Sequence, residues 1–191
     1  MKKAIHFAWG VLVLFALSVG ILWLAQASTA GASQTAKDIE RVWLLKQALP
    51  GAERFESVDK EGIQYEVGYR GEEVIGGVFH AVGTGYGGPM QFMVGLDPQG
   101  KVVEIVLVSH KESKGLGTRV ADPVFLSQFR GRGGPFILKK DDPSGNIDGV
   151  AAATLSTRGV IMAVEEAVKT FQSVWGTGEG TSPIPPVERE E

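Results

Sequence analysis

The stretch from Asp148 to Thr157 (DGVAAATLST) sets a threonine hydroxyl among small side chains, directly before a long segment with helical periodicity. Three alanines (151–153) leave steric room around Thr154, and Ser156 or Thr157 stands where a helix N-cap is expected. The free N–H groups and the positive dipole end of such a helix favour an anion. These residues predict a phosphate site beside the Thr154 hydroxyl, although for this loop alone simple capping and packing is the favoured interpretation.

A second candidate is the glycine-rich stretch 83–89 (GTGYGGP), between two predicted strands. Glycines allow positive φ angles and a close approach of the backbone to a ligand. The stretch is not a P-loop, because no Lys-Ser or Lys-Thr pair follows it, and it does not fit the dinucleotide pattern GxGxxG. By itself it is interpreted as a long turn. Its candidate binding residues are Gly85, Tyr86, Gly87 and Gly88.

A third candidate loop runs from His110 to Arg119 (HKESKGLGTR), directly after a predicted strand. Polar side chains at a strand end, followed by Gly-x-Gly, would suit a polar ligand at the rim of the sheet. His110 and Glu112 could also act as an acid–base pair, but no third group orients them and no nucleophile is nearby. A surface loop is therefore the favoured interpretation of these residues alone. The candidate binding residues are His110, Glu112, Ser113, Gly115, Leu116 and Gly117.

The composition limits what chemistry these loops can perform. A chain of 191 residues allows one domain with appendages. The net charge of -3, without a run of Lys or Arg among aromatics, argues against nucleic-acid binding. Cysteine is absent, which excludes disulfides, thiolate metal sites and a cysteine nucleophile within the chain. No metal site and no catalytic set of nucleophile, base and orienting group is predicted. Redox chemistry would require a bound cofactor, because the side chains of a chain without cysteine supply no two-electron centre.

The N-terminal region predicts a membrane anchor. No Asp, Glu, Lys or Arg lies between Lys3 and Lys37, and the apolar stretch 5–25 is long enough to cross a bilayer as a helix. Lys2 and Lys3 precede it, so the positive-inside rule predicts a cytoplasmic N-terminus and an exported remainder. A cleaved signal peptide is the alternative, since residues 25–27 (AQA) fit a cleavage site. We expect residues 1–27 to be the anchor or signal peptide.

The rest of the chain predicts an α+β fold with a mainly antiparallel sheet and packing helices. We expect a polar linker (28–36), a domain (37–175) and a disordered acidic tail (176–191). Within the domain, the predicted strands are 63–70, 73–82, 90–97, 101–109 and a brief one at 136–138. The predicted helices are 36–49, a short one from Asp122-Pro123 to about Phe129, and a long closing helix from Ser156 to about Trp175.

Taken together, the three loops resemble those of the FMN-binding domain family, whose flavinylation motif is written D-x-x-[ST]-G-A-T-x-[ST]. Asp148, Ala153, Thr154 and Ser156 match that motif. The order of features is also similar over roughly residues 1–172: a membrane helix, GYGGPM, HKESKGLG, a short helix and then the motif. Among the members, the G subunit of the Rnf-type electron transport complex is the more similar, and the C subunit of the sodium-translocating NADH:quinone reductase is related.

The resemblance implies a specific cofactor site. A separate flavin transferase would move FMN from FAD onto Thr154 as a phosphoester, and Asp148 would help present the loop to that enzyme. The motif residues Ala153, Leu155, Ser156 and Thr157 would surround the attachment point. The loops at 85–88 and 110–117, with His110 and Glu112, would line the flavin pocket.

Three positions depart from the family pattern. Ala151 and Ala152 stand where the family has Ser or Thr and Gly, and Lys114 replaces a proline. If the family glycine takes a positive φ, Ala152 would cost about 1 kcal/mol at that place. None of the three removes the acceptor hydroxyl.

The resemblance also implies the setting of the site. The bound FMN would relay electrons in an ion-translocating complex of the bacterial inner membrane, with the domain on the periplasmic side. The chain would be a redox subunit and not a stand-alone catalyst. Its partners would be the other subunits, the flavin transferase and the membrane. Two alternatives stay open: a flavin-dependent extracytoplasmic sensor or regulator, and a flavin-free periplasmic scaffold module.

Overall fold

The computed structural model describes residues 37–112 and 117–175. The chain divides into two compact units, Met1–Val42 and Trp43–Glu191. Residues 37–48 are helical, as predicted. The predicted anchor, linker and acidic tail lie outside the described residues. Within the described ranges, no helix combines the length and the apolar character needed to cross a membrane.

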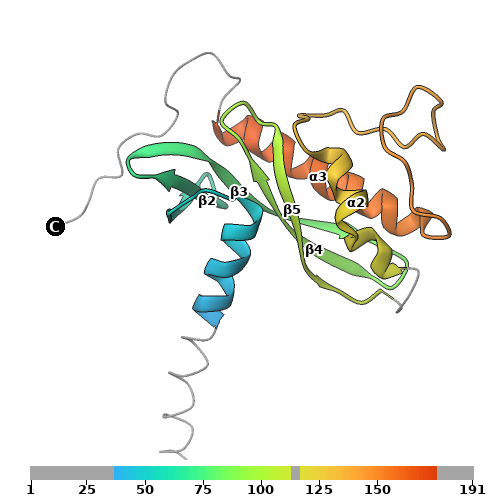
Figure 1. Ribbon diagram of the computed structural model, residues 1–191, viewed down its shortest axis with the longest axis horizontal. Helices are drawn as coiled ribbons and strands as arrows, with labels where there is room; N and C mark the ends of the chain where they lie inside the picture. The colour runs from blue at the N-terminus through green and yellow to red at the C-terminus, as the bar shows by residue number, and fades with distance from the viewer. Residues whose placement is uncertain (1–36, 113–116, 176–191) are drawn as a thin grey trace, which may run out of the picture. The chain divides into compact units, whose positions relative to one another are not determined.

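Five strands form one antiparallel sheet in the order β1-β2-β3-β4-β5, so each strand pairs with its neighbours along the chain (Figure 1). The strands are β1 (Arg54–Lys60), β2 (Ile63–Arg70), β3 (Glu73–Thr84), β4 (Pro89–Leu96) and β5 (Val102–His110). Gly62, Gly71 and Gly100 take positive φ angles in the turns between them. The predicted antiparallel α+β fold is confirmed. Strand β1 was not predicted, because no residue of it is fully buried and its sequence shows no apolar face.

The closing helix α3 (Thr154–Trp175) packs against one face of the sheet, mainly on β3 and β4 (Figure 1). The apolar stripe predicted for this helix is buried in the main core. Helix and strand approach most closely where Gly83 of β3 meets Gly159 of α3: a Cβ atom at Gly159 would lie 2.5 Å from the Thr84 carbonyl oxygen. This approach brings the start of α3 next to the glycine-rich loop that follows β3.

A smaller core covers the opposite face, as the alternation of side chains along the strands requires. It contains Leu45, Ala48 and Leu49, which pack with Val78, Met93 and Val106. This second core covers only part of that face, since Val82 and Val108 near the ends of β3 and β5 are exposed. The loops that follow these two strands lie at the rim of the sheet.

Short helices connect β5 to the motif loop: η1 (Gly117–Ala121), α2 (Pro123–Leu126) and η2 (Ser127–Phe129). The helix start predicted at Asp122 is confirmed, since its Oδ1 accepts a hydrogen bond from Val124 N at 2.8 Å.

The strand predicted at 136–138 is wrong. Leu138 forms an isolated bridge with Ile147. The chain instead folds back on itself over residues 137–147, where the backbone nitrogens of Asn146 and Ile147 donate to the Ile137 carbonyl oxygen. The apolar residues Phe136 and Leu138 that suggested a strand are buried in the main core without belonging to the sheet.

Candidate functional site

The motif loop leads directly into α3, which begins at Thr154 and not at Ser156 as predicted. Ala153 occupies the position before the helix, and the backbone nitrogen of Thr157 donates to its carbonyl oxygen at 2.9 Å. The Thr157 hydroxyl donates to the same carbonyl oxygen at 2.9 Å and accepts from Val150 N at 3.1 Å. The predicted N-cap role of Ser156 or Thr157 is therefore wrong, because both residues lie inside the first turn.

The N-terminal end of α3 places unpaired backbone N–H groups near Thr154. The first N–H groups of a helix have no partner inside it, and an alanine before the helix offers them no side-chain oxygen. The positive end of the helix dipole therefore lies beside the half-buried Thr154 side chain. The predicted phosphate site depends on this geometry.

Ala152 adopts a φ of 60°, in the left-handed region. The condition considered from the sequence, a positive φ at this position, is therefore met in this chain, and glycine is the residue that adopts such an angle without strain. An alanine in this conformation costs about 1 kcal/mol. Ala151 and Ala152 are both exposed, so the loop before Thr154 is open to a partner molecule.

Three consecutive side chains of the 137–147 turn contact the motif loop and α3. Lys139 Nζ lies 2.7 Å from Asp148 Oδ2. Lys140 Nζ donates to Thr154 Oγ1 at 3.3 Å. Asp141 accepts two hydrogen bonds from Arg158, at 2.6 and 3.2 Å. Sequence reasoning missed these contacts because residues 139–141 belong to no motif.

The Arg158 contact changes the ionisation of Asp141. The hydrogen bond from Arg158 lowers the pKa of the Asp141 carboxyl group below its ordinary value. Desolvation opposes this shift, and the charges of Arg158 and Lys140 lower the pKa further. Asp141 is therefore negatively charged at neutral pH and holds Arg158 against the turn.

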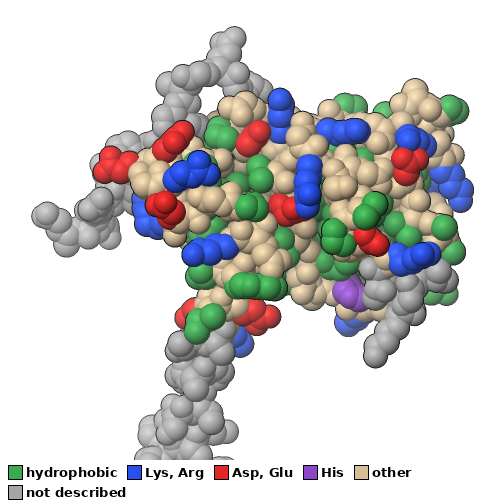
Figure 2. Space-filling model, viewed as in Figure 1, with side chains coloured by type: hydrophobic (Ala, Val, Ile, Leu, Met, Phe, Trp, Pro, Cys, Tyr) green, Lys and Arg blue, Asp and Glu red, His purple; other side chains and the backbone are tan. Residues whose placement is uncertain are grey.

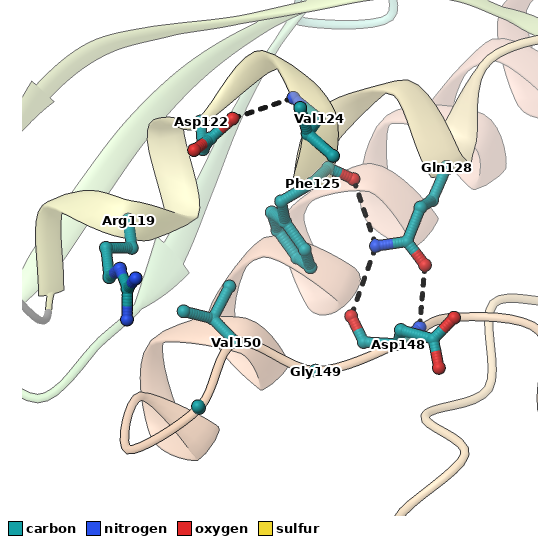
Figure 3. Close-up of a pocket in the computed structure, with 9 residues that line it drawn as sticks. Arg119, Asp122, Val124, Phe125, Gln128, Asp148, Gly149 and Val150 are labelled. Carbon is teal, nitrogen blue, oxygen red and sulfur yellow. Dashed lines mark hydrogen bonds between the residues drawn. The ribbon is translucent and has the colours of Figure 1, made fainter.

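The backbone of Asp148 is held by the side-chain amide of Gln128, as Figure 3 shows. Gln128 Oε1 accepts from Asp148 N at 2.7 Å, and Gln128 Nε2 donates to the Asp148 carbonyl oxygen at 3.1 Å. The same nitrogen donates to the Phe125 carbonyl oxygen at 3.3 Å. The start of the motif loop is thus attached to the segment formed by α2 and η2. Gln128 was not predicted, since a single glutamine in a short helix gives no sequence signal.

The glycine-rich loop is joined to α3 by a buried carboxylate. Glu112, which is 8% exposed, accepts from Gly87 N and from the Ser156 hydroxyl, both at 2.9 Å. Ser156 Oγ also accepts from Tyr86 N at 3.4 Å. A Cβ atom at Gly85 would overlap with the Glu112 carboxylate, so the tight turn requires glycine there. Residues from all three candidate loops therefore meet around Glu112.

His110 contributes differently from Glu112. Its Nδ1 accepts from the Glu112 backbone nitrogen at 3.1 Å, and its side chain is exposed. Since the Glu112 carboxylate is engaged by Ser156 and Gly87, the two side chains are not arranged as the acid–base pair considered from sequence. Tyr86 and Leu155 are also exposed, at 78% and 55%. Ser113, Lys114, Gly115 and Leu116 lie outside the described residues, and Gly117 opens η1.

A pocket of about 530 Å³ lies beside the motif loop (Figure 3). Phe125 of α2 forms part of its wall, and Arg119 of η1 points toward the loop. The remaining lining residues are Asp122, Val124, Gln128, Asp148, Gly149, Val150 and Ala151. The sequence did not predict this pocket, because η1 and α2 reach the motif loop only in the folded chain.

Acidic and basic side chains are interspersed over the face of the molecule shown in Figure 2. Among the described residues, no cluster of His, Asp and Glu has the geometry to hold a metal ion.

Comparison with known proteins gives consistent matches. The profile of the FMN-binding domain matches residues 85–169. The chain is 31% identical over 127 residues to the G subunit of a proton-translocating ferredoxin:NAD(+) oxidoreductase complex from Clostridium ljungdahlii, covering 65% of this chain and 68% of that protein. It is 36% identical over 97 residues to the G subunit of an ion-translocating oxidoreductase complex from Pseudomonas aeruginosa, covering 47% of this chain and only 44% of that protein.

The chain also has a more distant likeness to a solved structure. The C subunit of the Na(+)-translocating NADH-quinone reductase from Parabacteroides distasonis has a TM-score of 0.49 and 17% identity, covering 63% of this chain and 76% of that one.

Proposed function

Because this chain belongs to the FMN-binding domain family, we propose that it carries FMN in a phosphoester bond to Thr154 and relays electrons within a membrane-bound, ion-translocating complex. The observation that carries the proposal is the position of Thr154. It is the first residue of α3, its side chain is half-buried, and its oxygen contacts a lysine ammonium. A hydroxyl in this setting suits attachment of a phosphate group.

The residues around Thr154 fit such a group. Ala151, Ala152 and Ala153 present no bulky side chain, and the dipole end of α3 and the Lys140 ammonium both favour a negative charge. FMN supplies electron-transfer chemistry when bound, which a chain without cysteine cannot provide from its own side chains.

The candidate residues of the three loops have different roles in the proposed site. Asp148, held by Gln128, keeps the motif loop in the shape that is offered to the flavin transferase. Glu112 and Ser156 hold the glycine-rich loop against α3, next to the attachment point. We propose that the flavin pocket is lined by residues of these loops: Gly85, Tyr86, Gly87, Gly88, His110, Glu112, Ser113, Gly115, Leu116, Gly117, Ala153, Leu155, Ser156 and Thr157.

The setting of the protein follows from the same proposal. The named relatives are subunits of ion- or proton-translocating oxidoreductase complexes, so we propose that this chain also works beside other subunits and is not a stand-alone catalyst. Residues 1–27 would anchor the domain 37–175 on the outer side of the bacterial inner membrane, with 28–36 as linker and 176–191 as tail. A flavin transferase would supply the FMN.

Substitution of Thr154 tests the attachment. The full chain is co-expressed with a flavin transferase, separated on a denaturing gel, and viewed under ultraviolet light. We expect a fluorescent band for the wild type and for Thr154→Ser, which keeps a hydroxyl, and none for Thr154→Ala. Mass spectrometry of the peptide that contains residue 154 should show the added mass of FMN. A band that persists in Thr154→Ala would refute the assignment, and a wild-type chain without flavin would favour the scaffold alternative.

A further inference from the structure

Lys140 differs from its two neighbours along the chain in what it contacts. Lys139 and Asp141 are each paired with a side chain of opposite charge. The Lys140 ammonium instead donates to the neutral hydroxyl of Thr154 at 3.3 Å. The charge of Lys140 contributes to the lowered pKa of Asp141, but both Asp141 carboxylate oxygens accept hydrogen bonds from Arg158. The charge of Lys140 is therefore available to a negative group that arrives at the Thr154 oxygen.

The turn that carries Lys140 has a fixed backbone. Lys139 N donates to the Ile147 carbonyl oxygen at 2.9 Å, and Gly145 N donates to that of Asp142 at 2.8 Å. A Cβ atom at Gly145 would lie 2.7 Å from the Ile137 carbonyl oxygen, so the two sides of the turn approach as closely as a glycine permits. The Lys140 side chain thus extends toward Thr154 from a defined position, while remaining exposed to a partner enzyme.

We propose that Lys140 is the positioning residue for the attachment of FMN to Thr154, an inference that rests on the function proposed above. A threonine hydroxyl has one proton and two acceptor lone pairs. The Lys140 ammonium occupies one lone pair and orients the oxygen. The other lone pair remains for bond formation, and the proton remains free to leave.

The transfer balances as a phosphoryl exchange with FAD as the donor. The Thr154 oxygen forms a bond to the phosphorus of the FMN half, and the bond from that phosphorus to the bridging oxygen breaks, so that AMP leaves. The hydroxyl proton passes to a basic group of the transferase. No atom changes its oxidation state. The new ester keeps one negative charge, at a place that the Lys140 ammonium already reaches. Because hydrogen bonds between charged groups are stronger than those to a neutral hydroxyl, the contact strengthens as the ester forms.

The test compares initial rates of FMN incorporation into the purified full chain, with a flavin transferase and FAD, by in-gel flavin fluorescence and intact mass. The loss of one charged hydrogen bond should slow incorporation into Lys140→Ala about ten- to hundred-fold. Lys140→Arg, which keeps the cation, should recover most of the wild-type rate. Lys169→Ala is the control for the loss of one positive charge, since Lys169 is exposed near the other end of α3. It should react at the wild-type rate.

Each outcome has a distinct meaning. A Lys140→Ala rate within about two-fold of the wild type, or a Lys140→Arg rate as low as that of Lys140→Ala, would overturn the role of Lys140 while leaving attachment at Thr154 intact. Rescue by arginine shows that the cation at position 140 is what matters. Thermal melting followed by circular dichroism should be the same for all variants, which excludes a loss of folding as the cause of a slower rate. A wild-type chain that takes up no FMN would overturn the proposed function itself.

Discussion

Ala152 carries the clearest local conflict in the motif loop. Its φ of 60° is a conformation that glycine adopts without cost and that alanine avoids. Two residues later, Thr154 begins α3. The strained turn and the acceptor hydroxyl are therefore parts of one short segment, and the segment keeps its shape because Gln128 and Thr157 hold its backbone by hydrogen bonds.

Ala152→Gly is expected to stabilise the protein. Relief of the left-handed strain outweighs the greater freedom of glycine in the unfolded chain, giving a gain of about 0.5–1 kcal/mol in the free energy of unfolding. Denaturant unfolding followed by circular dichroism measures it. Ala151→Gly is the matched control: it does not share the positive φ, so it should lose stability. Equal changes in the free energy of unfolding for the two substitutions would argue against backbone strain at Ala152.

At the scale of elements, the turn 137–147 is held to α3 by the ion pair between Asp141 and Arg158. This pair joins a segment without regular secondary structure to the helix that begins at the acceptor threonine. The contact keeps Lys140 near Thr154 as long as Asp141 is ionised, because a protonated carboxyl group would lose most of its attraction for Arg158.

The pKa of Asp141 should respond to Arg158 and not to general changes in the turn. A pKa lowered in the folded state stabilises the fold above the ordinary carboxyl pKa, and this contribution is lost as the pH falls through the lowered value. Arg158→Ala should raise the pKa of Asp141 toward its ordinary value, as measured by an NMR titration of the carboxyl carbon. Asp142 serves as the internal control, since its pKa is lowered by hydrogen bonds from Ser144. A parallel shift of both groups would argue against the specific pair.

At the scale of the whole molecule, the site is assembled by the seating of α3 on the sheet. Where Gly83 and Gly159 meet, the helix lies against β3, and its first turn then reaches the glycine-rich loop and Glu112. The aromatic contacts at the other end, with Phe171 stacked on Trp175 and edge-on to Phe79, hold the helix along the same face.

Gly159→Ala tests the close packing of α3 on β3, because the change in stability should have opposite signs with and without that packing. Helix propensity alone predicts stabilisation by about 1 kcal/mol. Packing predicts the reverse, a loss of about 1–3 kcal/mol, because the new methyl group would lie 2.5 Å from the Thr84 carbonyl oxygen and 2.8 Å from Met90 Cε. Thermal unfolding measures the difference. Met162→Ala on the exposed face of α3 should change stability by no more than about 0.5 kcal/mol. A more stable Gly159→Ala protein would contradict the close packing.

The fold was predictable to the extent that each element has its own local pattern. Enrichment in Val, Ile, Tyr and Phe between turn sequences marked β2 to β5, and the stripe from Val160 to Phe171 marked α3. The sequence pattern gave no strand, or a wrong one, where the buried residues do not recur at a regular spacing. Strand β1 has no fully buried residue, and Phe136 and Leu138 enter the core from backbone outside the sheet.

The sequence by itself determined the three loops, the threonine among alanines, and the family to which they belong, because these depend on residue type and order along the chain. Only the tertiary structure decided which side chains meet. Glu112 lies beside Ser156, Gln128 beside Asp148, and Lys140 beside Thr154, in each case across a separation in sequence that no periodic pattern spans. The physical reason is that the close contact of α3 with β3 and the turn of residues 137–147 fix these distances, and both arise from packing of the whole chain.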